Sequence, residues 1–289
     1  MNWIISIVVI IILGFILDRE IYFYEGVHFG PRLQAWLYDR WSRKYDEGKR
    51  ASQLHDDEML ALPLLNALRE VPEPFVLDFA TGTGRLSFAL MSRPEFKGHI
   101  VALDLSQGML EQAASKLSQI LHASATEQNN VVHPFSAKVE LLRHRSLPLP
   151  FPDAAFDVVC ALEVLELFPN MDEPLKEFNR VLRPGGILLA SRGTEESGRK
   201  AKVKSAVELT SFLEGNGFEK IQITKWWKLF DRVIATKSGS SNLVGAKSLS
   251  EVLKCSACHS IRWRKTSNTW KCQNCGNELS ITNKGIVLN

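Results

Sequence analysis

Short apolar runs alternate with amphipathic stretches from residue 75 onward, and this alternation constrains the fold more than any other feature of the sequence. Apolar runs of roughly four to eight residues are typical of buried strands, and the stretches between them suit helices that cross over a sheet. The pattern predicts an α/β fold with a mostly parallel seven-stranded sheet and an antiparallel last strand. The candidate strands are residues 75–80, 99–106, 139–146, 156–163, 186–192, 220–227 and 231–236.

Composition sets the size of the core and the placement of charge. The chain has 289 residues, of which 45% are hydrophobic and 23% charged, enough for one sizeable core and a small appended module. The formal net charge is +3, but residues 199–289 carry 16 Lys and Arg against 6 Asp and Glu. This basic end could attract anionic lipid or RNA, although a solvated basic surface is the more common outcome.

The N-terminal segment MNWIISIVVIIILGFIL contains neither charge nor proline. As a helix it would reach about 25 Å, slightly short of a hydrocarbon layer of about 30 Å. We predict an uncleaved, single-pass membrane anchor at residues 1–20, with a buried core helix or an interfacial helix as the alternative. Basic residues follow the apolar run and none precedes it, so the rest of the chain is expected in the cytoplasm.

The remaining chain divides into four parts. Residues 21–72 interleave aromatic and charged side chains, which is typical of a helical cap or juxtamembrane segment and equally of ordinary helix packing. Residues 73–238 carry the α/β pattern, residues 239–250 are expected to form a flexible linker, and residues 251–289 form a small module rich in cysteine.

A glycine-rich turn follows the first candidate strand in VLDFATGTGRLSFAL. Asp78 ends the strand, and Gly82 and Gly84 lie in the turn before a helix. Glycine lets a backbone approach a ligand closely, and a helix N-terminus offers unpaired N–H groups. Asp104 ends the second strand, where a carboxylate can accept hydrogen bonds from both hydroxyls of a ribose. This spacing predicts a nucleotide-like ligand, while Ser87 at the third glycine position argues against a dinucleotide dehydrogenase.

These motifs resemble the S-adenosylmethionine (SAM) site of class I methyltransferases, and most closely the branch that contains quinone-biosynthesis enzymes. The resemblance continues through LPLPFPDAAFDVV, EVLELF and LKEFNRVLRPGGILLAS, and it covers about residues 73–236. It implies a Rossmann-like domain with SAM as cofactor. The implied contacts are Asp78, Ala80, Thr81, Gly82 and Gly84 to the methionine part, Asp104 to the ribose, and Leu105, Ser106 and Ser146 beside the adenine.

Two acidic residues lie at the C-terminal edge of the fourth candidate strand, where open α/β sheets bind their ligands. The sulfonium of SAM is already an activated electrophile, so aligning the reactants and excluding water are the main tasks of such an enzyme. A general base is useful if the acceptor is a hydroxyl or phenol. We predict Glu163 and Glu166 as the candidate catalytic residues, with a residue of the N-terminal segment as the alternative. Leu167 stands where the family often has histidine.

Four of the five cysteines form two CxxC pairs, separated by 13 residues. Two such pairs can present four thiolates tetrahedrally, which predicts a structural zinc site with no open position. An iron centre or unligated thiols are the alternatives. The module also resembles small zinc-ribbon proteins that bind and activate methyltransferases, which implies a fused stabiliser of the catalytic domain or a substrate-recognition arm. The predicted zinc ligands are Cys255, Cys258, Cys272 and Cys275.

The sequence therefore predicts a membrane-anchored, SAM-dependent methyltransferase that acts on a small lipophilic acceptor such as a quinone, isoprenoid or lipid precursor. An RNA or protein methyltransferase guided by the zinc ribbon is the rival enzyme, but EVLELF lacks the NPPY-like pattern of amine methylation. Nucleic acid is thus a possible but not a favoured partner. A non-catalytic SAM-binding scaffold is the third hypothesis. The sequence does not predict an oligomeric state.

Overall fold

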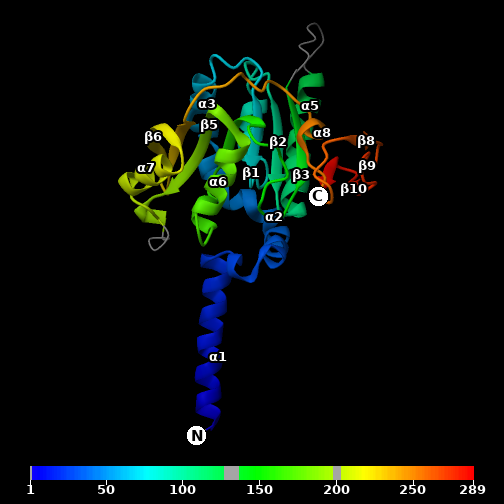
Figure 1. Cartoon of the computed structure of the whole chain (residues 1–289). Helices are drawn as coiled ribbons and strands as arrows, with labels where there is room; N and C mark the ends of the chain where they lie inside the picture. Colours follow the sequence, from blue (N-terminus) through cyan, green and yellow to red (C-terminus); the bar gives the residue numbers. More distant parts are fainter. Residues whose placement is uncertain (1, 127–136, 198–202) are drawn as a thin grey trace.

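The computed structural model describes residues 2–126, 137–197 and 203–289 and shows an α/β body from which the N-terminal helix projects (Figure 1). The helical segments are α1 (Asn2–Asp18), η1 (Arg19–Phe23), η2 (Val27–Phe29), α2 (Pro31–Gln53), η3 (Asp57–Ala61), α3 (Leu62–Ala67), α4 (Arg85–Met91), α5 (Gln107–Thr126), η4 (Leu165–Leu167), α6 (Asp172–Val181), η5 (Glu195–Ser197), α7 (Ala206–Gly215) and α8 (Leu249–Val252). The strands are β1 (Phe75–Phe79), β2 (His99–Asp104), β3 (Lys138–Arg143), β4 (Phe156–Ala161), β5 (Leu182–Gly193), β6 (Phe218–Trp227), β7 (Phe230–Lys237), β8 (Trp263–Lys265), β9 (Thr269–Cys272), β10 (Glu278–Ile281) and β11 (Ile286–Leu288).

The first seven strands form a Rossmann-like sheet in the order β6-β7-β5-β4-β1-β2-β3. Strand β7 runs antiparallel to both β5 and β6, and the pairs from β5 to β3 are parallel. The predicted α/β sheet is confirmed, and it is mixed because the short connection between β6 and β7 forms a hairpin. Strands β1 and β4 are buried along their whole length, as expected for central strands covered by helices on both faces.

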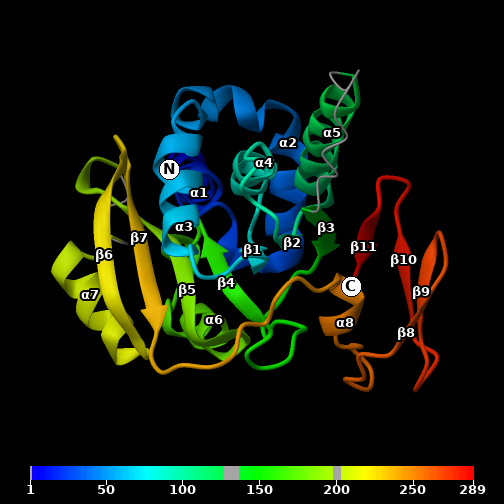
Figure 2. The same cartoon turned by 90° about the horizontal axis from the view of Figure 1, so that it is seen from above.

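Helices cover both faces of this sheet (Figure 2). On one face α6, α7 and α8 pack over a core that includes Phe75, Phe156 and Phe178. On the other face α3, α4 and α5 pack over a second core that includes Leu90 and Ile100. The periodic apolar runs of the sequence therefore become the two buried faces of one sheet.

The cysteine-rich module extends the same sheet. Strand β11 pairs in parallel with β3, and β10, β9 and β8 follow, so that the sheet has eleven strands. The segment between β7 and the module is also attached to the α/β body. The backbone N–H groups of Val244 and Gly245 donate to the buried carboxylate of Asp157 in β4, at 3.0 and 3.1 Å. The cysteine module thus adds directly to the edge of the α/β body.

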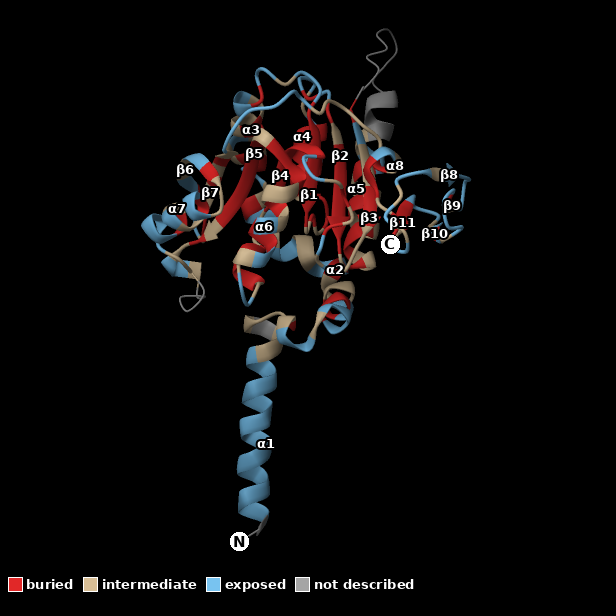
Figure 3. Cartoon of the chain, in the orientation of Figure 1, coloured by how far each residue is buried: buried red, intermediate tan, exposed pale blue. Residues whose placement is uncertain are grey.

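Helix α1 carries exposed apolar side chains along its length (Figure 3), with Trp3, Ile10 and Phe15 each about two-thirds exposed. Within the described ranges, no helix is long and apolar enough to cross a membrane. The helix has 17 residues and is followed by the charged pair Arg19–Glu20. The structure therefore does not support the predicted membrane-spanning helix at residues 1–20.

Candidate active site

The turn between β1 and α4 shapes one end of a cavity at the C-terminal ends of the parallel strands. Ala80, Gly82 and Gly84 all have positive φ angles, of 53°, 56° and 78°. A β-carbon on Gly84 would lie 3.1 Å from a side chain of α5, so glycine allows close packing there. The backbone N–H of Thr81 donates to the carbonyl of Leu103 at 3.0 Å, which ties the turn to β2.

Asp78 stabilises this turn from the end of β1. Its buried carboxylate accepts hydrogen bonds from the hydroxyls of Thr81 (2.6 Å) and Ser87 (2.8 Å). Burial raises the pKa of Asp78, although these two hydrogen bonds act in the opposite direction. Asp78 thus joins the turn to the first part of α4, and it also lines a small cavity next to the main one.

Asp104 lies at the end of β2, on the opposite side of the turn. One of its carboxylate oxygens accepts from the backbone N–H of Gly82 and the other from that of Ser106, both at 2.8 Å. Burial raises the pKa of Asp104 to about 6, and the two backbone N–H groups limit this rise. Each oxygen keeps a second lone pair, so the carboxylate can still accept hydrogen bonds from a ligand.

Helix α2 packs over the glycine-rich turn and the end of β2, and its N-terminal half contributes polar contacts through Asp39. Asp39 accepts hydrogen bonds from the hydroxyl of Ser106 (2.6 Å) and from the backbone N–H of Gly108 (2.8 Å). The Ser106 hydroxyl in turn accepts from the N–H of Met109 at 3.0 Å. Helix α2 therefore fixes the first turn of α5, which follows the strand that carries Asp104.

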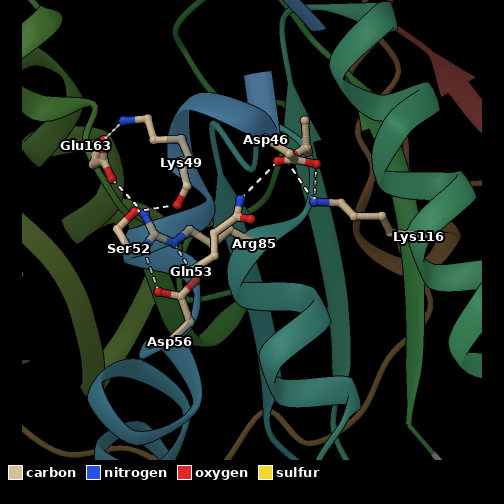
Figure 4. A network of polar contacts seen from close by, with 9 residues as sticks. Asp46, Lys49, Ser52, Gln53, Asp56, Arg85, Lys116 and Glu163 are labelled. Carbon is tan, nitrogen blue, oxygen red and sulfur yellow. Dashed lines mark hydrogen bonds and ion pairs between the residues drawn. The ribbon is translucent and has the colours of Figure 1, made fainter. Parts of the chain in front are cut away.

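Two clusters of polar contacts attach the C-terminal half of α2 to its neighbours (Figure 4). Asp46 accepts hydrogen bonds from Thr83 in the glycine-rich turn (2.6 Å) and from Gln53 (2.9 Å), and it forms an ion pair with Lys116 of α5 (2.9 Å). Burial raises the pKa of Asp46, but these hydrogen bonds outweigh it and the net shift is downward. This cluster connects α2 with the turn and with α5.

The second cluster joins α2 to the end of β4. Glu163 forms ion pairs with Lys49 and with Arg85, the latter at 2.8 Å (Figure 4). The same guanidinium binds Asp56, with an Nη2 to Oδ1 distance of 2.6 Å. The side chains of Arg85, Asp56 and Glu163 are each at most 14% exposed. Arg85 thus bridges two carboxylates that come from opposite sides of the site.

The main cavity has a volume of about 310 Å³ and lies between these elements. Its polar lining residues include Gln34, Asp104, His144, Arg145, Ser146, Glu163 and Glu173. Its remaining wall is largely apolar and comes from the N-terminal segment and from the ends of several strands. The apolar lining residues include Val27, Pro31, Phe79, Leu103, Leu105, Met109, Leu147, Leu162, Val164, Leu167 and Phe168. A small cavity of about 50 Å³ adjoins it and shares Tyr45, Ala80, Gly82, Leu162 and Glu163 with it.

The structure brings most of the predicted cofactor residues to these two cavities. Ala80, Gly82, Asp104, Leu105 and Ser146 line the main cavity, and Asp78 and Thr81 line the small one. Gly84 and Ser106 belong to neither lining, and they instead fix the neighbouring helices α4 and α5.

The two predicted catalytic carboxylates, Glu163 and Glu166, lie at different cavities. Glu163 faces the main cavity, at a positive φ of 55°, and its backbone N–H donates to the Ser191 hydroxyl at 2.6 Å. Glu166 is buried in η4 and lines a different hollow, together with Arg192 and Lys204. Strand β4 ends at Ala161, and the chain enters the short helix η4 before it reaches Glu166, so the two side chains do not share one strand face.

Sequence reasoning missed two tyrosines of α2 that line the main cavity. The hydroxyl of Tyr38 donates to the Glu25 carboxylate, and burial together with this carboxylate raises the pKa of Tyr38. Burial and the carboxylate of Glu163 likewise raise the pKa of Tyr45. Both phenols therefore stay protonated near neutral pH. The only signal for them was the interleaving of aromatic and charged residues in residues 21–50.

The four predicted zinc ligands meet at one point. The Sγ atoms of Cys255, Cys258, Cys272 and Cys275 all lie within 4.8 Å of one another, and two of the pairs are 3.6 Å apart. Tetrahedral zinc with Zn–S bonds of about 2.3 Å would place its sulfurs at similar separations. The cluster is therefore consistent with a zinc ribbon.

Comparisons with known proteins point to one activity. A family model described as "Methyltransferase domain" matches residues 77–190. The chain is 27% identical over 222 residues to demethylmenaquinone methyltransferase of Lactobacillus johnsonii, covering 65% of this chain and 86% of that protein. It is 34% identical over 116 residues to a ubiquinone/menaquinone biosynthesis C-methyltransferase of Hahella chejuensis, covering 39% of this chain and 41% of that one.

A solved structure agrees on the fold. The crystal structure of a SAM-dependent methyltransferase from Aquifex aeolicus matches with a TM-score of 0.50 and 19% identity, over 69% of this chain and 98% of the other. The likeness therefore extends over about two-thirds of this chain and nearly all of the other protein.

Proposed function

We propose that this chain, which is a class I SAM-dependent methyltransferase, transfers a methyl group to a small lipophilic acceptor. The main cavity carries the proposal, because most of its lining residues are apolar, among them Val27, Pro31, Leu167 and Phe168. Gln34, His144, Arg145, Ser146 and Glu173 add a smaller number of polar groups to the same lining. Cavities of this kind, with few polar groups, suit small and largely apolar molecules. The distant relatives named for menaquinone and ubiquinone synthesis support a quinone-like acceptor.

The cofactor would occupy the part of the cavity next to the glycine-rich turn and Asp104. SAM supplies a methyl group on a sulfonium that already reacts readily with nucleophiles. Asp104 would accept hydrogen bonds from the ribose hydroxyls, and the turn from Ala80 to Gly84 would hold the methionine part. Helix α2 would exclude water, because Tyr38 and Tyr45 close the cavity on that side.

Glu163 remains our candidate for acid–base chemistry, since its carboxylate lies at the cavity wall. Lys49 and Arg85 neutralise this carboxylate, so accepting a proton would require one of these ion pairs to loosen. Glu166 lies outside the cavity lining, and its proposed role is therefore secondary. An acceptor carbon or nitrogen that needs no base would use Glu163 only to hold α2 in place.

We also propose that α1 brings the enzyme to a lipid surface, with the catalytic domain on the cytoplasmic side. The apolar side chains of α1 are exposed, and the basic residues that follow favour an anionic surface. Val27 and Pro31, which line the main cavity, lie shortly after α1 in the chain. A lipophilic acceptor could thus enter beside the helix that contacts lipid.

Methyl transfer from labelled SAM tests the acceptor class. The purified full chain is incubated with [methyl-³H]SAM and with extracts from cells that lack the gene, in which the unmethylated acceptor accumulates. Label is then counted separately in the lipid, RNA and protein fractions. We expect label in the lipid fraction, and none with Asp104→Ala. Label in RNA or protein instead would replace the proposal by the rival enzyme, and SAM binding without transfer to any fraction would favour a scaffold.

A further inference from the structure

The last residue after β11 of the cysteine module contacts the wall of the cofactor cavity. Strand β11 pairs in parallel with β3, with Leu288 opposite Arg143, so the residue after β11 lies beside the residue after β3. That residue is Asn289. Its backbone N–H donates to the carbonyl of Arg143 at 3.1 Å, and its side-chain amide nitrogen lies 3.1 Å from Nδ1 of His144.

His144 belongs to the wall of the main cavity. It is the first of four consecutive lining residues, His144 to Leu147, and its backbone N–H donates to the carbonyl of Asp104 at 3.0 Å. Burial lowers the pKa of His144, so the ring is neutral near pH 7. The backbone carbonyls of Ser146 and Pro148 interact with the same ring.

A neutral imidazole carries one proton, and its neighbours decide which nitrogen holds it. The Asn289 amide donates to Nδ1, which places the proton on Nε2. With this tautomer the ring accepts from Asn289 at Nδ1, whereas the protonated Nε2 has no hydrogen-bond partner among the described residues. The amide therefore fixes both the orientation and the protonation of a side chain that lines the cavity.

We propose that Asn289 is a positioning residue for the cofactor cavity, acting through His144, and that the cysteine module and the cofactor site are thereby energetically coupled. The proposal rests on the proposed function only in assigning this cavity to SAM. Coupling of this kind is reciprocal: if the module improves cofactor binding, the bound cofactor must stabilise the module by the same factor.

Binding of S-adenosylhomocysteine, measured by calorimetry on the full chain, tests the proposal without an acceptor. Asn289→Ala removes the amide but keeps the backbone N–H that bonds to Arg143. We expect its dissociation constant to rise by about 5- to 10-fold, as for the loss of one buried hydrogen bond. The matched control is Lys284→Ala, which removes contacts between the module and α5 at Ser115 and Glu111 but none at the cavity. This control should bind like the wild type.

A double-mutant cycle and a metal-release assay separate positioning from general stability. Asn289→Ala should have little further effect in a His144→Ala background, because the amide acts through that ring. S-adenosylhomocysteine should also slow the removal of zinc by a colorimetric chelator from the zinc-loaded wild type, and do so less in Asn289→Ala.

The outcomes are distinct. Unchanged affinity in Asn289→Ala, additive effects in the cycle, or equal losses in Lys284→Ala would each overturn the positioning role. A wild-type chain that does not bind S-adenosylhomocysteine would overturn the proposed function instead, and with it the assignment of this cavity.

Discussion

The strand side and the α2 side of the site hold their carboxylates differently. On the strand side, Asp78 and Asp104 accept hydrogen bonds from hydroxyl and backbone N–H groups. The α2 side is the set of contacts that attach α2 to the strand ends. There Asp56, just after α2, and Glu163, just after β4, are both paired with the guanidinium of Arg85. The carboxylates on the strand side can thus accept further hydrogen bonds from a ligand. Those on the α2 side are already engaged in ion pairs that attach α2 to the rest of the site.

This difference indicates that ligand binding and the attachment of α2 over the site depend on different elements of the structure. The contacts of Asp104 reach Gly82 and Ser106, at most 22 residues away in the chain. Those of Glu163 reach Arg85 and Lys49, which are 78 and 114 residues away. Changes on the strand side should therefore affect cofactor binding first, and changes on the α2 side should affect stability first.

Asp104→Ala should have the largest effect. Two charge-assisted hydrogen bonds to the ribose would be lost, so the affinity for S-adenosylhomocysteine should fall at least about 100-fold. Calorimetry measures this directly, with Asp153→Ala as the control because the side chain of Asp153 is 78% exposed. An affinity that stays within a factor of three would mean that the strand side does not hold the cofactor.

Arg85→Gln should mainly affect folding stability. The change leaves two buried carboxylates with a weaker partner, and we expect the free energy of unfolding to fall by about 2–4 kcal/mol. Urea denaturation followed by circular dichroism measures this value. If Arg85→Gln weakened S-adenosylhomocysteine binding strongly but left stability unchanged, the division of tasks between the two sides would be wrong.

The pH dependence of binding should report Asp104. Its pKa is raised to about 6 in the folded chain, so the folded state binds the proton more tightly than the unfolded state does. The contribution of this group to stability is therefore greatest at low pH and is lost as the pH rises through 6. Ligand binding needs the ionised form, so affinity should fall about tenfold between pH 7 and pH 5. Asp104→Asn should remove this dependence, and a dependence that persisted in the variant would assign it to another group.

Removing an exposed ion pair should have the smallest effect. Lys271 and Glu278 are 2.9 Å apart on the cysteine module, and both are more than half exposed. Lys271→Ala should change the free energy of unfolding by less than about 0.5 kcal/mol, because water and salt screen such pairs. A loss as large as that of Arg85→Gln would show that the burial of the α2 contacts does not explain their strength.

The strand side could be predicted from the sequence because its parts are contiguous. Asp78, Gly82 and Gly84 stand in one short motif, and Asp104 follows at the end of the next strand. The cysteine cluster could be predicted for the same reason, since two CxxC pairs fix four sulfurs by local spacing.

The α2 side could not be predicted in detail, because its contacts depend on how distant elements pack. Nothing local in the sequence joins Lys49 to Glu163 or Asp46 to Thr83. The same limit applies to the pairing of β11 with β3, since a strand pattern does not name its neighbour. The burial of Glu166 away from Glu163 was also missed, because the prediction considered only that both residues lie near the end of β4.

The pairing of β11 with β3 also matters for how the protein is handled in the laboratory. Strand β3 contains Val139, Leu141 and Leu142, and its outer backbone groups bond to β11. A chain shortened to the Rossmann-like part would bare these groups, and an open apolar edge is a template for self-association and aggregation. In the full chain the outermost strand is instead the short β8, where Arg264 and Lys265 are exposed. The module thus replaces the apolar edge strand β3 by the short, positively charged edge strand β8.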